Sequence, residues 1–244
     1  RIEFTYNLAI VLVVFILYAL LGFLDDFISI KRKHNEGLTI AQKFLGQVLI
    51  ALIFFFIFMK YDGNTNFTIS TLGIDIDLGW GYGIFILLLL VGFSNAVNLT
   101  DGLDGLSGGL SAIAFIAFAL ISLFIGQEDM GIFCFILVGT IAGFLMFNAY
   151  PARIFMGDTG SLALGGVIAT VAILTRREIT LFIICLPFVI ETASSMIQIF
   201  WYKLKKKRIF LNSPLHHHFE KLGYEEPDIV KAFWLFGILC SLAG

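Results

Sequence analysis

The chain has 244 residues, of which 59% are hydrophobic and only 14% are charged. Because soluble domains carry about a quarter charged residues, this composition excludes an ordinary soluble protein and favours an integral membrane protein. The formal net charge of −2 indicates nothing about partners, and no nucleic-acid partner is predicted.

Eight apolar segments have about the length that a membrane-spanning helix requires, which is roughly 20 residues. In chain order they cover residues 5–24, 44–59, 82–97, 106–125, 131–147, 161–174, 180–201 and 231–244. The connection 61–81 alternates polar and apolar residues and is predicted to form a small hairpin or a surface strand. We therefore predict an all-α, polytopic membrane protein with eight visible transmembrane helices, in which residues 1–244 form a single transmembrane domain.

Basic residues in the connections predict which side of the membrane is cytoplasmic. Four of the 16 Lys and Arg residues, Arg1, Lys60, Arg176 and Arg177, belong to one set of connections. The others mark the cytoplasmic side: Lys31, Arg32, Lys33, Lys43, Arg153, Lys203, Lys205, Lys206, Lys207, Arg208, Lys221 and Lys231. Four polar motifs fall on this same side: LDD at 24–26, NLTDGLDGL at 98–106, FMGDTGS at 155–161 and PLHHHFE at 214–220.

The first motif places Asp25 and Asp26 at the predicted C-terminal end of the first span. A helix C-terminus carries partial negative charge, so two adjacent carboxylates there require a divalent cation, a lysine or a proton nearby. The alternative is that they cap the next short helix or lie in solvent beside the basic residues 31–33.

The second motif contributes Asp101 and Asp104, three residues apart between the third and fourth spans. The two carboxylates share a face if the fourth helix has already begun, although simple helix capping is the alternative. The glycines around them allow the backbone to approach a phosphate closely, and Asn98 adds an amide at the end of the preceding helix.

In the third motif, Asp158 and Ser161 stand at the predicted start of the sixth span. Asp158 suits an N-cap, yet a carboxylate at a membrane interface is also a natural ligand for Mg²⁺ beside substrate phosphates. Phe155 is either an interface anchor or a stacking platform for a base.

The fourth motif holds three consecutive histidines, His216, His217 and His218, in the polar connection after the seventh span. Their side chains diverge, so phosphate contact or proton transfer is more natural for them than one shared metal ion. The seventh span itself carries Glu191 and Gln198, and an ionisable group within a span is a candidate functional residue.

Together these residues predict a cytoplasm-facing site that is rich in carboxylates and has glycines at its helix ends, where they give the backbone conformational freedom. This chemistry suits a Mg²⁺-assisted phosphoryl transfer from a soluble anionic donor to a lipid-borne acceptor, because carboxylates without a cation would repel the phosphates. An ion-coupled transporter is the alternative from another class. Transporters place their coupling carboxylates near the bilayer midplane, however, rather than together at one interface.

The four motifs, in this order and with NAYPARIFMGDTGSLALGG around the third, resemble the polyprenyl-phosphate N-acetylhexosamine-1-phosphate transferase superfamily. PLHHHFE favours its bacterial phospho-N-acetylmuramoyl-pentapeptide transferase branch over the branches that use UDP-N-acetylglucosamine, which remain the alternative. The resemblance covers essentially the whole chain. It implies a Mg²⁺-dependent enzyme of peptidoglycan synthesis and cell-wall biogenesis, which transfers phospho-N-acetylmuramoyl-pentapeptide from UDP to undecaprenyl phosphate and gives lipid I and UMP.

The resemblance also implies a multi-pass protein of the bacterial inner membrane, usually a homodimer, with ten helices and an active site that faces the cytoplasm. The family carries two further N-terminal helices and a GTPTMGG-like segment, which are expected to precede residues 1–244. Two mechanisms are left open: direct attack by the lipid phosphate, or a covalent aspartyl intermediate.

The resemblance assigns roles by motif. Asp25 is implied as the base or nucleophile toward the lipid phosphate, and the other catalytic residues are Asp26, Asp101, His217 and His218. Asp158 and Asp101 are the implied metal ligands. Asp104 is placed toward the uridine, and the residues implied to bind substrate are Lys43, Asn98, Asp104, Asn148, Phe155, Ser161, Gln198 and His216.

Overall fold

The computed structural model describes residues 5–32, 37–69 and 74–244. Arg1 and Lys33 of the basic residues counted above lie outside these ranges, as do residues 70–73 of the connection 61–81. The described residues form, in chain order, α1 (Tyr6–Arg32), α2 (Ile40–Tyr61), β1 (Asn66–Ile69), β2 (Ile74–Asp77), α3 (Gly81–Thr100), α4 (Leu106–Phe124), α5 (Glu128–Asn148), α6 (Gly157–Leu174), α7 (Glu178–Ile184), α8 (Leu186–Lys205), α9 (Leu215–Lys221) and α10 (Glu226–Ala243).

Six helices, α1 to α6, are long and apolar enough to cross a membrane. The pair α7 and α8 also qualifies when taken together, but the chain bends by 78° between them. An all-α, multi-pass membrane architecture is therefore confirmed, with six spans in the described residues, or seven if the bent pair is one span. The predicted count of eight is not confirmed, because the last span falls on α10, which begins with the charged residues Glu226, Asp228 and Lys231.

α6 is the most enclosed of the spanning helices, and every residue from 161 to 174 is buried. Helices in lipid associate through close packing at small residues, because lipid tails are as apolar as the helix surfaces. A Cβ on Gly22 of α1 would lie 2.1 Å from the backbone oxygen of Asp158, and one on Gly166 would lie 2.4 Å from the Tyr18 ring. These glycines let α1 and α6 approach closely, which brings the acidic turn of α1 beside the start of α6.

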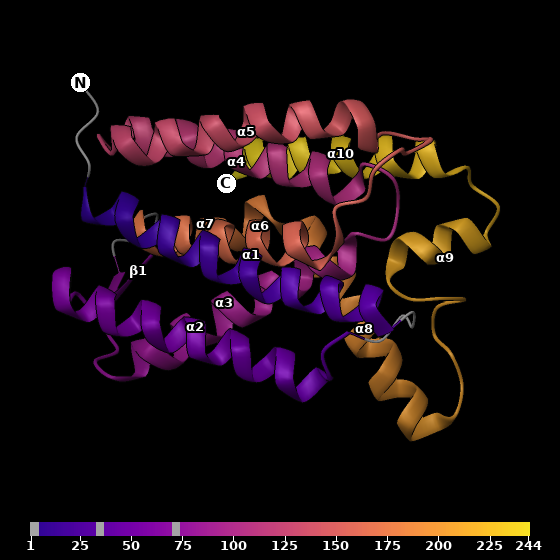
Figure 1. Ribbon diagram of the computed structural model, residues 1–244, viewed down its shortest axis with the longest axis horizontal. Coiled ribbons are helices and arrows are strands. Elements are labelled where there is room, and N and C mark those ends of the chain that lie inside the picture. The colour runs from indigo at the N-terminus through magenta and orange to yellow at the C-terminus, as the bar shows by residue number, and fades with distance from the viewer. Residues whose placement is uncertain (1–4, 33–36, 70–73) are drawn as a thin grey trace.

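Consecutive spanning helices alternate in direction, so the first three polar motifs lie at one end of the bundle, where α8 also ends and where the fourth motif forms most of α9 (Figure 1). The hairpin of β1 and β2 lies at the opposite end (Figure 1), with Asn66 paired antiparallel to Asp77. The hairpin predicted in the connection 61–81 is therefore confirmed.

The first helix differs from its predicted extent. α1 continues to Arg32, so Asp25 and Asp26 lie inside the helix rather than at its C-terminal end. The residues that follow them, FISIKR, are helix-compatible and contain no glycine or proline, which explains the continuation. The charge of the helix end therefore does not act directly on these two carboxylates.

Two other motifs also differ from expectation at a helix start. Residues 101–105 form a turn and α4 begins only at Leu106, so Asp101 and Asp104 do not share a helix face. Gly105 explains this, because its φ of +78° is left-handed and interrupts the helical backbone. Asp158 is not the N-cap of α6 but lies inside its first turn.

Candidate active site

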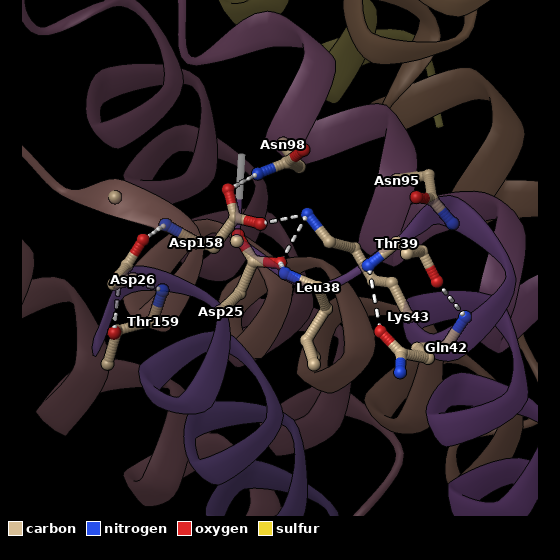
Figure 2. A network of polar contacts seen from close by, with 12 residues as sticks. Asp25, Asp26, Leu38, Thr39, Gln42, Lys43, Asn95, Asn98, Asp158 and Thr159 are labelled. Carbon is tan, nitrogen blue, oxygen red and sulfur yellow. Dashed lines mark hydrogen bonds and ion pairs between the residues drawn. The ribbon is translucent and has the colours of Figure 1, made fainter. Parts of the chain in front are cut away.

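Carboxylates from two helices meet beside one lysine at the motif-bearing end of the bundle. Figure 2 shows Lys43 of α2 pointing between Asp25 of α1 and Asp158 of α6, while Asp26 turns toward the start of α6. Oxygens of the three carboxylates lie within 4.8 Å of one another. Lys43 Nζ forms an ion pair with Asp158 and lies 3.3 Å from Asp25 Oδ1. Three carboxylates around one ammonium leave an excess of negative charge, which attracts a further cation.

Both carboxylate oxygens of Asp26 accept hydrogen bonds from the start of α6. Oδ1 accepts from the Asp158 N–H at 3.1 Å, and Oδ2 accepts from the N–H and the hydroxyl of Thr159 at 2.9 and 2.6 Å. The first N–H groups of a helix have no intrahelical acceptor, and this end of a helix carries partial positive charge. Asp26 therefore caps α6 from another helix and fixes the position of Asp158.

Residues 38–42, just before and at the start of α2, position Asp25 and Lys43. Asp25 is buried, and its Oδ1 accepts a hydrogen bond from the Leu38 N–H at 2.9 Å. α2 begins with a capping box, in which the Gln42 N–H donates to the Thr39 hydroxyl at 3.3 Å and the Gln42 side chain accepts from the Thr39 N–H at 3.0 Å. The box fixes the first turn of α2, so Lys43, the next residue, is directed at the carboxylates.

Asn98 orients Asp158 from a third helix, α3. Its Nδ2 donates to Asp158 Oδ1 at 2.6 Å and to Ser161 Oγ at 2.8 Å. The Ser161 hydroxyl donates in turn to the Gly157 carbonyl at 2.8 Å, and Ser161 is fully buried. One oxygen of Asp158 thus faces Asn98 and the other faces Lys43, while the structure places Ser161 behind Asn98.

A cavity of about 330 Å³ opens beside this cluster. Its lining brings together Asn98, Asp101, Gly102, Leu103, Asp104, Asn148, Phe155, Met156, Gly157 and Asp158. Burial, and after it the charges of Asp158 and Asp26, raises the pKa of Asp101 to about 7. The Phe155 side chain is 77% exposed, so its ring is open to stacking by a planar ligand.

The turn at residues 101–105 is held from two sides at Asp104. Its Oδ2 accepts a hydrogen bond from the Ala152 N–H at 2.8 Å, which ties the turn to the connection between α5 and α6. Its own N–H donates to Glu226 Oε1 at 2.6 Å, which ties the turn to α10. The Asp104 carboxylate is therefore fixed at the cavity wall by the backbone of another segment.

Asn148 and Trp234 hold the next residue of the turn. The Gly105 N–H donates to Asn148 Oδ1 at 3.1 Å, and Asn148 Nδ2 donates to the Ile154 carbonyl at 2.9 Å. The Trp234 indole N–H donates to the Gly105 carbonyl at 3.2 Å, and the Trp234 ring lies against Gly109, where a Cβ would come within 2.0 Å of it. Asn148 thus borders the cavity with its amide already engaged by the protein.

The first histidine of the fourth motif lies behind the cavity. His216 and Glu191 are fully buried, with His216 Nδ1 at 2.9 Å from Glu191 Oε2, and the His216 N–H donates to Glu191 Oε1 at 3.2 Å. A Cβ on Gly102 would lie 2.3 Å from His216 Nε2. His216 therefore supports the turn that carries Asp101 from its rear.

The other two histidines point elsewhere. His217 Nδ1 contacts Glu220, and His218 Nδ1 accepts a hydrogen bond from the Leu211 N–H at 3.1 Å. Gln198 is also separate from the cavity: its Oε1 accepts from the N–H groups of Ile209 and Phe210 at 3.0 and 3.1 Å, and its Nε2 donates to the Phe210 carbonyl at 3.1 Å. The lining residues of the cavity in the described structure include none of these three side chains.

The carboxylate cluster fits a divalent metal ion. Hard cations such as Mg²⁺ prefer carboxylate oxygens, and three such groups from two helices converge here within 4.8 Å. Asp25 and Asp158 both face the Lys43 ammonium, where a cation is already held, whereas Asp26 faces the N–H groups at the start of α6; Asp25 and Asp158 are therefore the residues best placed to hold the ion. Asp101, implied as a ligand by the resemblance, lies outside this close group, although the negative charge of Asp158 acts on it.

Sequence reasoning missed several residues that build the site. Thr159 completes the cap of α6, and Glu226 and Trp234 of α10 hold the turn at 101–105. The position of Thr159 beside Asp158 is only a weak sequence signal of a role in the site. Glu226 and Trp234 give no sequence signal, because their partners are backbone atoms more than 120 positions away in the chain.

The family model and the curated relatives that match this chain agree with each other. Residues 8–176 match glycosyl transferase family 4. The chain is 53% identical over 227 residues to the phospho-N-acetylmuramoyl-pentapeptide-transferase of Geobacillus sp. (strain WCH70). The aligned region covers 93% of this chain and 70% of the relative. The chain is also 50% identical over 242 residues to the protein of the same name from Bacillus subtilis (strain 168), covering 99% of this chain and 75% of the relative.

Proposed function

The chain belongs to the phospho-N-acetylmuramoyl-pentapeptide-transferase family within glycosyl transferase family 4, and from this membership we propose the reaction that it catalyses. It transfers phospho-N-acetylmuramoyl-pentapeptide from the UDP-linked donor to undecaprenyl phosphate, giving lipid I and UMP in peptidoglycan synthesis. The observation that carries the proposal is the cluster of Asp25, Asp158 and Lys43 at the mouth of a polar cavity, in a chain about 50% identical to these transferases over most of its length.

The donor occupies the polar cavity in this proposal. A nucleobase stacks on the exposed ring of Phe155, and Asp104, fixed at the cavity wall, lies toward the uridine. The diphosphate lies near Asp158 and Asp101, where bare carboxylates would repel it. Mg²⁺, held by Asp158 and Asp25, would supply charge neutralisation of the diphosphate when bound.

The bond changes are those of direct attack, one of the two mechanisms left open by the sequence. An oxygen of the acceptor phosphate attacks the phosphorus that carries the sugar, and the bond from that phosphorus to the bridging oxygen breaks, so that UMP leaves. Asp25 acts on the acceptor phosphate as base or orienting group, and Lys43 neutralises phosphate charge. Holding two charged reactants in line is the main contribution that a protein makes to phosphoryl transfer.

An apolar groove provides a place for the prenyl chain of the acceptor. The groove holds about 370 Å³ between α3, α7 and α8 and is lined by Phe85, Leu88, Leu89, Gly92, Phe93, Ala96, Phe182, Val189, Thr192, Ala193 and Met196. Ala96 stands two residues before Asn98 on α3, which rises about 1.5 Å per residue. Ala96 and Asn98 point to different sides of α3, so a chain in this groove would bring its phosphate to the level of the carboxylate cluster along the helix axis.

Filling the groove should impair long acceptors selectively. We expect Ala193→Trp to raise KM for undecaprenyl phosphate about tenfold, because lost burial of even a few methylene groups is worth more than about 1.4 kcal/mol. A short prenyl phosphate that does not fill the groove should be used almost as before. Ile136→Trp, on the exposed face of α5, is the matched control. Equal effects of Ala193→Trp on short and long acceptors would remove the groove from acceptor binding.

The wider architecture is part of the proposal. The excess of basic residues at the motif-bearing end favours a site that faces the cytoplasm of the bacterial inner membrane, in an eight-span segment of a ten-helix protein. Labelling of single cysteines at residue 207 and in the hairpin at residue 66, from either side of sealed vesicles, tests this orientation. The homodimer rests on the family resemblance, and the mass of the detergent-solubilised protein tests it.

The function itself is tested by UMP release. The full-length, detergent-solubilised enzyme is supplied with undecaprenyl phosphate and Mg²⁺, and with UDP-N-acetylmuramoyl-pentapeptide or UDP-N-acetylglucosamine in separate reactions. We expect release only from the muramoyl donor, and loss of release with EDTA. Release only from UDP-N-acetylglucosamine would assign the chain to the alternative branch of the superfamily. No release from either donor by a folded enzyme would favour a transporter instead.

A further inference from the structure

A second cavity lies apart from the carboxylate cluster, where α8 ends and the chain passes on to α9. It holds about 270 Å³, and its polar lining comprises Gln198, Tyr202, Lys203, Arg208, Asn212 and Ser213. Figure 1 shows this part of the chain at the motif-bearing end of the bundle, between the labels α8 and α9. The reaction derived above uses none of these residues, although the family resemblance implies Gln198 in substrate binding.

Hydrogen bonds hold the walls of this cavity in place. Gln198 is buried, and its amide makes three hydrogen bonds with the backbone of Ile209 and Phe210, so the segment after α8 is fixed against the helix. The Arg208 guanidinium donates to the Leu211 carbonyl at 3.1 Å, which directs it along the segment. Two sides of the cavity are thus held by side chain to backbone hydrogen bonds.

The cavity carries positive charge without a matching acid. Among the described residues, no carboxylate lies within the 4.0 Å ion-pair distance of either Lys203 or Arg208. The hydroxyl of Ser213 and the amide of Asn212 add neutral hydrogen-bond donors beside them. A guanidinium and an ammonium with adjacent neutral donors are the groups that recognise a carboxylate.

The cavity is within reach of the donor site. Ser213 stands three residues before His216, which an extended chain separates by at most about 11 Å. His216 Nε2 lies against Gly102, and Gly102 lines the cavity beside the carboxylate cluster. An extended pentapeptide spans roughly 17 Å, so a peptide on a sugar bound at the first cavity can extend to the second.

We propose that this cavity, defined by Lys203 and Arg208, binds the terminal carboxylate of the donor's peptide. The proposal rests on the function proposed above and deepens it by giving the peptide its own subsite. A peptide joined to the sugar through its amino end carries a free carboxylate at its far end, which supplies the anionic group that the two cations bind. Tyr202 supplies an apolar surface for the adjoining residue.

The test compares two donors that differ in one charge. UDP-N-acetylmuramoyl-pentapeptide and its C-terminal carboxamide are given to the full-length wild-type enzyme and to the Lys203→Gln/Arg208→Gln variant. We expect the variant to raise KM for the natural donor about tenfold, with kcat within about twofold, since a partly exposed charged contact is lost. The wild type should lose about as much with the carboxamide, and the variant should not distinguish the two donors. Lys207→Gln, in the same basic run but outside the cavity lining, should behave as wild type.

Each departure from this pattern has a meaning. An unchanged KM, or an equal rise for both donors, would overturn the peptide subsite. An equal loss in Lys207→Gln that appears only in vesicles containing phosphatidylglycerol would assign the basic run to the membrane surface and likewise overturn it. The wild-type reaction separates this inference from the proposed function: if the wild type releases no UMP from the muramoyl donor, the function itself fails.

Discussion

The Asp158→Asn variant is expected to lose at least about a thousandfold in turnover while remaining folded. Asp158 supplies an oxygen to the carboxylate cluster, pairs with Lys43 and lines the donor cavity. Stabilisation of phosphate charge by a metal ion is worth several kcal/mol, and about 1.4 kcal/mol corresponds to a factor of ten in rate. Asparagine keeps an oxygen that accepts from Asn98, but its amide nitrogen faces the Lys43 ammonium, so the variant loses this ion pair together with the charge.

Initial rates of UMP release across a range of Mg²⁺ concentrations measure this effect. Because the loss acts through metal affinity, we expect the residual rate to rise as Mg²⁺ is increased. Asp228→Asn is the matched control: Asp228 lies in the first turn of α10, is exposed, and pairs only with Lys231 among the described residues. Wild-type turnover at ordinary Mg²⁺ in a folded Asp158→Asn protein would remove Asp158 from the site.

The sequence predicted the membrane class and the gathering of the four motifs at one end, because both follow from long-range patterns. Apolar length locates the spans, and alternating helix direction determines which connections share a side. The seventh span was predicted as one segment, but the structure bends the chain by 78° between α7 and α8. The only signal was Pro187, which is tolerated within transmembrane helices and therefore does not predict a bend.

The residue types of the candidate site were predictable from the sequence, but the contacts and the role of each residue were not. Adjacent Asp25 and Asp26 look equivalent in sequence, yet helical geometry turns one toward Lys43 and the other toward the start of α6. In the same way, the three histidines face Glu191, Glu220 and the Leu211 backbone separately. Such assignments depend on tertiary contacts between distant helices, for which local sequence carries no signal.

The different contacts of Asp25 and Asp26 lead to the second prediction of large effect, which is that the same substitution impairs turnover far more at Asp25 than at Asp26. We expect Asp25→Asn to lose about a thousandfold in kcat, because it removes the charge that faces Lys43 and, in the proposed reaction, acts on the acceptor phosphate, while the amide oxygen still accepts from the Leu38 N–H. Asp26→Asn should lose less than about tenfold. Asparagine keeps one of the two acceptor oxygens at the start of α6, and the lost charge there is worth only about 0.3–1 kcal/mol.

Asp26→Ala separates capping from charge. It removes both acceptors at the start of α6, so we expect about 0.5–2 kcal/mol of lost stability, seen as a lower unfolding temperature in detergent, with a fall in turnover larger than that of Asp26→Asn. A positioning role for Asp26 requires that turnover fall most in Asp25→Asn, less in Asp26→Ala and least in Asp26→Asn. If Asp26→Asn were folded, as stable as wild type and as inactive as Asp25→Asn, the negative charge of Asp26 would belong to the chemistry. The resemblance-based assignment of both aspartates as catalytic would then hold, because a variant of unchanged stability would have kept its cap on α6 and lost only the charge.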